Sequence, residues 1–331
     1  MNAGTQEQGW ENRHARQAEW RELCTSELSI PLFSRAWWLD TVCGADWDVL
    51  FVRKGAQVQG AMPYTMQRRR GFCLSEMPPL TQNLGPWVAP SSAQPTKSFS
   101  REAQILGELC AQIPPLDRFA QNWHPSRTNW LPFYWAGYSQ TTRYTYRLEA
   151  FADESLQWKH LRDKARTEIR KAQGRFGLVE DQHASIETFL NLNDMVFRRQ
   201  GLAAPYSESL VRRIFEHGSS RGDVTLHIIN DAEGVAHAGA VVLYDSTSAY
   251  YLLGGSDPSQ RNSGAMTLCL WLAILKAGQR VKIFDFEGSM MPNLEPFVRS
   301  FGATQTPYFR IQRTSSRTLR AITMLRGSLE R

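Results

Sequence analysis

Hydrophobic residues recur with two different spacings along the chain, and the spacing predicts the type of each element. Recurrence every three or four residues is typical of a helix, and alternation with a period of two is typical of a strand. In the first half, the pattern predicts helices at 13–24, 31–44 and 100–113 and strands at 48–54, 57–69 and 142–150. The Pro- and Gly-rich segment 75–95 predicts a long loop before the third helix.

The second half starts with helical patterns and continues with strands. The expected elements are helices at 159–176, 185–201 and 207–218, then strands at 223–229, 236–245 and 248–255. After a polar loop, residues 266–275 are apolar nearly all round, which predicts a helix buried against a sheet. The remaining expected elements are a strand at 281–286, a short helix at 293–302, a strand at 304–313 and a helix at 314–330.

This order of elements predicts a mixed α/β fold in two domains. A chain of 331 residues is long enough for two domains of about 100–200 residues each. We expect the boundary near Ala150, which gives an N-terminal domain 1–150 and a C-terminal domain 151–331. The apolar fraction of 42% and the eleven tryptophans favour sizeable cores filled largely by aromatic side chains.

Cysteine usage and the absence of long apolar runs narrow the class of protein. The five cysteines are scattered and no CxxC pair occurs, which argues against a disulfide framework and a cysteine-type zinc site. The first 20 residues contain no apolar segment typical of a signal peptide. The longest strongly apolar run, 266–275, is shorter than the roughly 20 residues that span a membrane. We therefore expect a cytoplasmic protein without a transmembrane segment.

Two common catalytic patterns are missing from the sequence. His227 and His237 lie in neighbouring predicted strands, but no HxH or HExxH spacing occurs, so no metal site is expected. No GxSxG segment occurs either, which argues against a serine hydrolase of the α/β type.

The predicted helix at 159–176 is strongly basic. Within 159–175 there are seven basic and two acidic residues, while the net charge of the whole chain is only +6. Arg162, Arg166 and Arg170 are spaced by four residues and therefore share one helix face. Two interpretations stay open: a ridge that meets an anionic substrate, or an ordinary solvated surface.

The loop at 259–266 has the composition of a phosphate-binding turn. It lies between a predicted strand and the buried helix, where backbone N–H groups and the helix dipole favour negative charge. Arg261 can add a charge-assisted contact, and Gly264 allows close approach of the backbone. The loop is neither a Walker A nor a Rossmann glycine motif, and a plain turn is the alternative interpretation.

The segment FDFEGS at 284–289 places two acids where a predicted strand ends. If the strand continues through Glu287, Asp285 and Glu287 point to the same face and Phe284 and Phe286 to the other. A carboxylate at this end of a sheet strand can accept a proton from an attacking amine. The alternative is that either acid caps the next helix or pairs with an arginine.

Several segments in a fixed order resemble a known family. Residues 250–311, together with IRKA at 169–172 and the ordered set GG, FDFEGS and FGA, resemble the FemAB-like (including CelD-like) branch of the GNAT acyltransferase superfamily. The resemblance implies a tandem pair of GNAT-like domains and transfer of an acyl or aminoacyl group to an amine. GNAT proteins bind the donor at a loop of type Q/R-x-x-G-x-G/A, in which Arg261 and Gly264 match and Met266 stands where glycine or alanine is typical.

The resemblance also implies roles for particular residues. The donor-binding candidates are Arg261, Asn262, Ser263, Gly264 and Ala265, the catalytic candidates are Asp285, Glu287 and Tyr251, and the acceptor-binding candidates are Arg166, Arg170, Lys171 and Tyr308. The implied donor is acyl-CoA, or aminoacyl-tRNA as in the Fem ligases, although no segment here predicts their long helical arm. The implied acceptor is an amine on a cell-envelope, polysaccharide or peptide-like precursor.

Two other functions remain as alternatives. A GNAT scaffold that has lost catalysis and binds a ligand or partner protein is compatible with the methionine at position 266. An RNA-associated role through the basic helix predicts an affinity that falls steeply with salt.

Overall fold

The computed structural model describes residues 12–92, 94–149, 151–288 and 290–322. The chain divides into two compact units, and each is described by itself. The first consists of Met1–Arg143 together with Pro307–Arg331, and the second of Tyr144–Thr306. This division differs from a single boundary near Ala150, because the chain returns to the first unit within strand β13, Thr304–Thr314.

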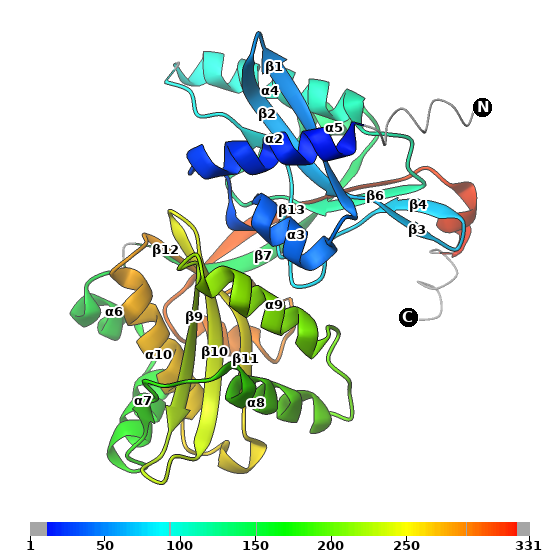
Figure 1. Cartoon of the computed structure of the whole chain (residues 1–331). Helices are drawn as coiled ribbons and strands as arrows, with labels where there is room; N and C mark the ends of the chain where they lie inside the picture. The colour runs from blue at the N-terminus through cyan, green and yellow to red at the C-terminus, as the bar shows by residue number, and fades with distance from the viewer. Residues whose placement is uncertain (1–11, 93, 150, 289, 323–331) are drawn as a thin grey trace. The chain divides into compact units, whose positions relative to one another are not determined.

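The first unit contains two groups of strands with helices around them (Figure 1). Its helices are α2 (Arg13–Ser26), η1 (Leu32–Ser34), α3 (Ala36–Cys43), α4 (Pro95–Gln112) and α5 (Leu131–Trp135). Its strands are β1 (Trp47–Lys54), β2 (Gln57–Thr65), β3 (Gln67–Arg69), β4 (Phe72–Ser75), β5 (Trp87–Val88) and β6 (Arg118–Asn122), with the start of β7 (Ser139–Glu149) and most of β13. One sheet has the order β1-β2-β5, and the other strands follow the order β3-β4-β6-β13.

Successive side chains of β1 point to opposite faces of the strand and pack into two different hydrophobic cores of this unit. Val49 packs with α2 and α3 in one core, and Leu50 packs with α4 in the other. The predicted core role of tryptophan is confirmed at several positions, since the fully buried side chains include Trp20, Trp38, Trp47 and Trp123. The predicted helix end at Gly44 is also confirmed, because Gly44 follows α3 with φ +59°.

The second unit is a sheet covered by helices on both faces (Figure 1). Its strands follow the order β7-β12-β11-β10-β9-β8. They comprise the end of β7, β8 (Val179–Glu180), β9 (Val224–Asn230), β10 (Ala236–Tyr244), β11 (Ser248–Ser256) and β12 (Ile283–Asp285). Its helices are α6 (Glu154–His160), α7 (Asp163–Gly174), α8 (Ile186–Arg198), α9 (Glu208–Ser219), η2 (Pro258–Gln260), α10 (Ala265–Gly278) and α11 (Glu295–Arg299).

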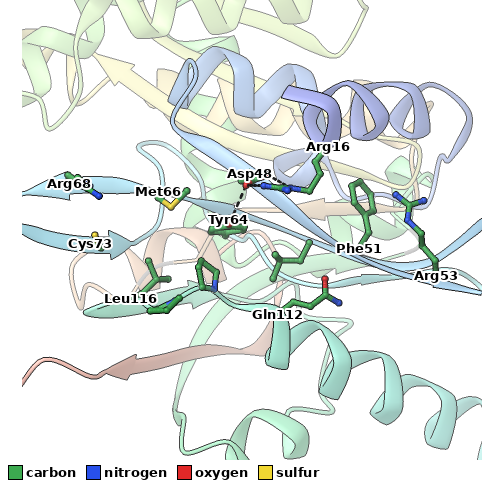
Figure 2. Close-up of a pocket in the computed structure, with 13 residues that line it drawn as sticks. Arg16, Asp48, Phe51, Arg53, Tyr64, Met66, Arg68, Cys73, Gln112 and Leu116 are labelled. Atoms are coloured by element: carbon green, nitrogen blue, oxygen red, sulfur yellow. Dashed lines mark hydrogen bonds and ion pairs between the residues drawn. The ribbon is translucent and has the colours of Figure 1, made fainter. Parts of the chain in front are cut away.

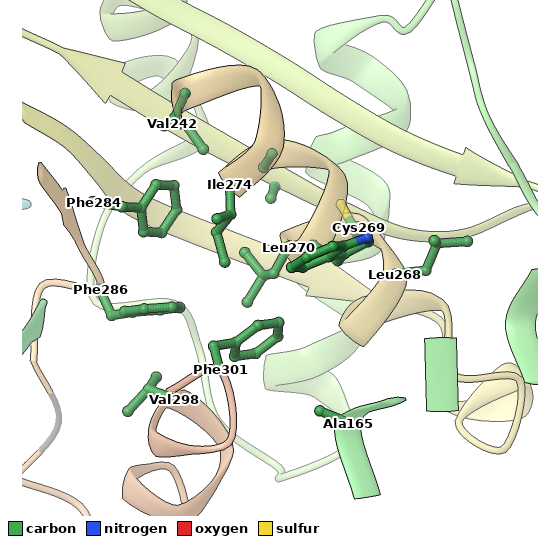
Figure 3. Packing of buried hydrophobic residues seen from close by; sticks show 14 of the residues in the cluster. Ala165, Val242, Leu268, Cys269, Leu270, Ile274, Phe284, Phe286, Val298 and Phe301 are labelled. Carbon is green, nitrogen blue, oxygen red and sulfur yellow. The ribbon is translucent and has the colours of Figure 1, made fainter. Parts of the chain in front are cut away.

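Glycines and small residues bring the helices close to this sheet. A Cβ at Gly239 of β10 would meet the Phe189 ring of α8 at 3.2 Å, and a Cβ at Gly255 of β11 would lie 2.6 Å from the Asn193 backbone nitrogen of the same helix. On the opposite face, α10 packs against β9 and β10 in the main core, where Ala240 and Val242 lie (Figure 3). The prediction that α10 is buried is confirmed.

The prediction of a single helix at 159–176 is wrong, because the helical conformation is interrupted between α6 and α7. Leu161 is extended and buried, and the backbone N–H of Arg162 donates to the carbonyl of Ser300 at 2.9 Å. A contact with a distant segment therefore interrupts a stretch whose spacing is helical. The expected final helix is observed at 317–322, and the rest of it lies outside the described residues.

Candidate active site

Strands β11 and β12 run parallel for three residues and then separate. Their paired residues are Ser248 with Ile283, Ala249 with Phe284 and Tyr250 with Asp285. Strand β12 ends at Asp285, whereas β11 continues to Ser256 and carries an extra residue opposite the Val241–Val242 step of β10. Beyond Tyr250, one edge of β11 is therefore no longer paired with β12, and its backbone groups can meet a ligand.

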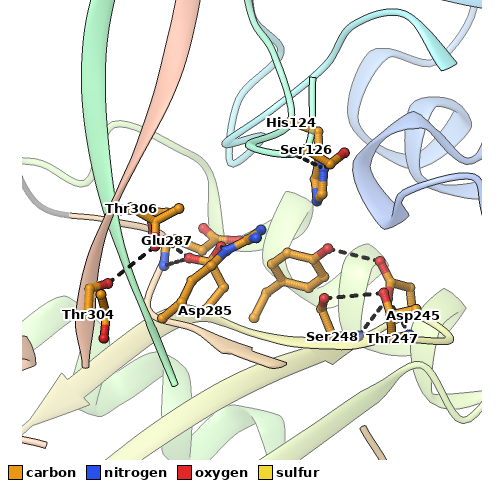
Figure 4. A network of polar contacts seen from close by, with 12 residues as sticks. His124, Ser126, Asp245, Thr247, Ser248, Asp285, Glu287, Thr304 and Thr306 are labelled. Carbon is orange, nitrogen blue, oxygen red and sulfur yellow. Dashed lines mark hydrogen bonds and ion pairs between the residues drawn. The ribbon is translucent and has the colours of Figure 1, made fainter. Parts of the chain in front are cut away.

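Asp285 is buried in a network of hydrogen bonds at this point (Figure 4). Its carboxylate accepts from Arg147 Nε at 2.7 Å, from the Thr145 hydroxyl and from the backbone N–H of Glu287 at 2.8 Å. The residue is 1% exposed, so the ion pair with Arg147 is shielded from water. The interpretation in which an acid of FDFEGS pairs with an arginine and holds the turn thus describes Asp285.

Glu287 is in a different environment from Asp285. It has φ +57° and is followed by Gly288 with φ +73°, where a Cβ would overlap the carbonyl oxygen of Tyr144. Its Oε1 atom is buried and has no hydrogen-bond partner among the described residues. Burial, and secondarily the charge of Asp285, raise the pKa of Glu287 well above its ordinary value. A carboxyl group of this kind is a candidate proton acceptor.

Tyr251 follows Tyr250, the last residue of β11 that pairs with β12. A Cβ at Gly254 would overlap the Tyr251 hydroxyl, so glycine at that position makes room for the phenol. Burial is the main cause that raises the pKa of Tyr251, and it keeps the hydroxyl protonated near neutral pH. The hydroxyl has no hydrogen-bond partner among the residues that the structure describes. It can therefore donate a hydrogen bond to a ligand.

The predicted donor loop forms a tight turn between β11 and α10. The Asp257 side chain accepts from the Ser259 N–H at 2.7 Å, and the Ser263 N–H donates to the Gln260 carbonyl at 2.9 Å. Gly264 has φ +79° at the start of the 14-residue helix α10, and a Cβ there would overlap the carbonyl oxygen of Glu168 in α7. Glycine is therefore required both by the backbone conformation and by the close approach of α7.

A pocket of about 350 Å³ lies at this loop. All five predicted donor-binding residues line it: Arg261, Asn262, Ser263, Gly264 and Ala265. Lys164 and Lys171 of α7 also line it, so three cations and the two carboxylates of Glu168 and Asp257 surround the pocket, a formal balance of +1. This combination of a helix start and cations favours a phosphate-bearing ligand.

Met266 lines the same pocket. A Cβ built on Gly254 would lie 3.4 Å from Met266 Cε, so this side chain reaches toward β11.

His237 is a residue of this pocket that the sequence analysis did not select. It is 3% exposed, and its Nε2 lies 3.2 Å from Asp231 Oδ2. Its Nδ1 is buried without a hydrogen-bond partner among the described residues, and the residue lines the pocket. His227, in the neighbouring strand, is instead held by Glu180 at 2.7 Å. The two histidines lie in the paired strands β9 and β10, and their different positions along these strands give them different partners. No sequence motif marks His237.

The basic residues of α7 separate into two groups. Arg166 binds Asp163 and the carbonyls of Trp158 and Lys159, and the Arg170 guanidinium lies 5.4 Å from the Trp158 ring centre. These arginines thus attach α7 to α6. Lys171 instead pairs with Glu168 at 2.5 Å beside the donor loop.

Tyr308 lies in the first unit. Its hydroxyl accepts a hydrogen bond from Arg143 Nε at 3.2 Å.

The described residues contain neither a cluster of metal-binding side chains nor a helix suited to spanning a membrane. No group of three or more His, Cys, Asp or Glu side chains in the described ranges is arranged to hold a metal ion. Within the same ranges, no helix combines the length and apolar character needed to cross a membrane. All five cysteines are free, and Cys269 is buried in α10.

Comparison with known proteins identifies the fold. Residues 159–293 match the acetyltransferase (GNAT) domain family. The structure is similar to FemX, with a TM-score of 0.65 and 13% identity over 88% of this chain and 95% of that one. No curated protein matches the sequence.

Two further solved structures share the fold. The C-terminal domain of a putative lysylphosphatidylglycerol synthetase from Agrobacterium fabrum gives a TM-score of 0.57 at 13% identity, over 95% of this chain and 97% of that one. The L-PGS structure from Bacillus licheniformis gives 0.52 at 10% identity, over 88% and 91%. These matches confirm the expected resemblance and the mixed α/β fold of the tandem GNAT kind.

Proposed function

We propose, from the GNAT acetyltransferase domain that residues 159–293 carry, that the protein is an N-acyltransferase. The observation that supports this most directly is the buried Oε1 atom of Glu287, which has no hydrogen-bond partner among the described residues and lies two residues beyond the point where β11 and β12 separate. In the same unit, a pocket with a helix start and an excess of one positive charge suits the phosphates of a donor. We propose acyl-CoA as the donor, with aminoacyl-tRNA as the alternative.

The reaction we propose is attack of a neutral amine on the acyl carbonyl carbon. Glu287 accepts the proton that the amine nitrogen loses as the new C–N bond forms. Backbone N–H groups on the unpaired edge of β11 stabilise the oxyanion, and the Tyr251 hydroxyl donates a hydrogen bond to the leaving sulfur or oxygen as its bond to carbon breaks. Asp285 acts as a positioning residue, since its carboxylate holds the Glu287 N–H.

The acceptor in this proposal is an amino group on a cell-envelope, polysaccharide or peptide-like precursor. Lys171, which was predicted to contact the acceptor, lines the pocket that we propose for the donor, so it supports donor binding instead. Arg166, Arg170 and Tyr308 stay predictions as acceptor contacts. Location in the cytoplasm likewise stays a prediction.

A thermal-shift measurement with coenzyme A and acetyl-CoA tests the donor site. A ligand held only by the folded state at about 100 times its Kd stabilises it by about 2.7 kcal/mol. We expect the melting temperature of the wild-type protein to rise and the rise to disappear in Gly264→Val, because valine strains the left-handed backbone and collides with Glu168. Gly174→Ala is the control, since a Cβ at Gly174 meets nothing within 4 Å.

The outcome separates the alternatives. A shift with uncharged tRNA but none with either CoA compound would favour an aminoacyl-tRNA donor. A folded wild-type protein that responds to none of these ligands would contradict the proposed transferase and favour a scaffold without catalysis.

His237 gives a second test of the same pocket. We expect His237→Phe to weaken coenzyme A binding about tenfold in calorimetry, because the variant keeps the ring shape and loses the Nδ1 atom that a phosphate or its bound water can meet. His183→Phe, at an exposed position of the same unit, should leave the affinity unchanged. Equal affinities for wild type and His237→Phe would remove His237 from the donor site without affecting the rest of the proposal.

A further inference from the structure

The first unit contains a pocket of its own, with a volume of about 530 Å³ (Figure 2). It lies beside β1 and β2, the β3–β4 hairpin and the segment that follows α4. All residues that line it belong to the first unit, whereas the donor loop and Glu287 belong to the second. The GNAT domain match at 159–293 does not include it, and the proposed transfer makes no use of it.

The walls of this pocket are largely apolar. The wall residues include Leu50, Phe51, Met66, Pro115 and Leu116. They come from β1, from the start of the hairpin and from the segment after α4, so three separate stretches of chain converge on one space. A concave space of this size with apolar walls and a few polar groups is typical of a site for a small organic molecule.

One polar group of the pocket is already neutralised by the protein. Asp48 is 1% exposed and accepts from Arg16 Nε at 2.9 Å and from Arg16 Nη2 at 2.5 Å. The Tyr64 hydroxyl donates to the same carboxylate at 3.3 Å, and burial raises the pKa of Tyr64, which keeps that proton in place. A cationic ligand would have to compete with this arginine for the carboxylate.

The remaining charges of the pocket are positive. Its lining contains three arginines and one aspartate, a formal balance of +2. Arg53 pairs with Glu19 at 2.5 Å and lies 4.9 Å from the Phe51 ring centre. Arg68 is exposed on β3 and has no partner among the described residues. An unpaired guanidinium next to apolar walls can bind a carboxylate or phosphate while the walls cover an apolar body.

We propose that this pocket binds a small organic acid, with its anionic group at Arg68 and its apolar body against Leu50, Met66 and Leu116. The apolar walls disfavour inorganic anions, and the positive lining disfavours cations and favours anions over neutral ligands. The site is separate from the proposed acyl transfer, so either proposal can fail without the other.

The alkylation rate of Cys73 can report whether a ligand occupies the pocket. It is a free, partly exposed cysteine that lines the pocket, whereas Cys24 and Cys43 are partly exposed cysteines elsewhere in the unit. The full-length protein is alkylated with N-ethylmaleimide, and the rate at each cysteine is measured by mass spectrometry. We expect 1-naphthoate to slow alkylation of Cys73 at least fivefold and to leave the rates at Cys24 and Cys43 unchanged.

Two comparisons make this experiment specific. Uncharged 1-naphthamide should protect Cys73 about tenfold less well than 1-naphthoate, because it lacks the anionic group. Arg68→Glu should lose the protection by naphthoate, and Arg69→Glu, a neighbouring exposed arginine that does not line the pocket, should keep it.

Absence of protection at millimolar naphthoate would overturn the proposal. So would equal protection by the amide, which would indicate an apolar site without charge selection. An equal effect of the two arginine variants would indicate nonspecific attraction to a basic surface.

Discussion

Replacing Glu287 with glutamine is expected to lower kcat by about 10²–10⁴-fold with little change in the KM for the donor, because an amide cannot accept the proton of the attacking amine. The measurement is the rate of CoA release with a panel of amine acceptors. Glu154→Gln, at an exposed position in the first turn of α6, is the matched control and should retain full activity. Undiminished turnover in Glu287→Gln would remove this residue as the base.

Glu287→Gln is also expected to stabilise the protein at high pH. Folding raises the pKa of Glu287, so its contribution to the free energy of unfolding is fully present below the ordinary carboxyl pKa and is lost as the pH rises through the raised folded value. We therefore expect Glu287→Gln to melt at a higher temperature than wild type at pH 8 and at nearly the same temperature at pH 4. Melting curves at both pH values distinguish this from a merely disruptive substitution.

The largest loss of stability is expected at Arg147. Arg147→Met removes the cation of a buried ion pair and leaves the charge of Asp285 uncompensated, which is expected to lower the free energy of unfolding by about 3–5 kcal/mol. Denaturant unfolding measures this change. Arg198→Met breaks a pair whose arginine side chain is 79% exposed, and it should cost less than about 1 kcal/mol.

A double variant tests the cause of that loss. In Arg147→Met with Asp285→Asn, the uncompensated charge is gone, and we expect a substantial part of the stability to return. If the double variant is no more stable than Arg147→Met alone, the loss reflects packing around the arginine instead of an unpaired carboxylate.

Most of the elements of the second unit can be predicted from the sequence alone. The strands at 224–230, 236–244 and 248–256 and the buried helix at 265–278 lie close to their predicted positions. Hydrophobic periodicity is a local property, and it persists when the helix or strand packs. The tight turn at 259–266 was also recognisable, because a glycine between a strand and a helix start is a local signal, while its role in donor binding stays a proposal. Short elements such as β5, β6 and α5 have too few residues to show a period.

The different environments of the two acids in FDFEGS depend on contacts between distant segments and could not be predicted from the sequence. Alternation predicted one face for Asp285 and Glu287, but it could not show that Arg147, 138 residues away in sequence, pairs with the first and that the second has a buried oxygen without a partner. The surroundings of His237 and the pocket of the first unit likewise depend on contacts between segments that are distant in sequence. Burial and the position of a partner charge set the properties of these groups, and both depend on how the strands are ordered and registered.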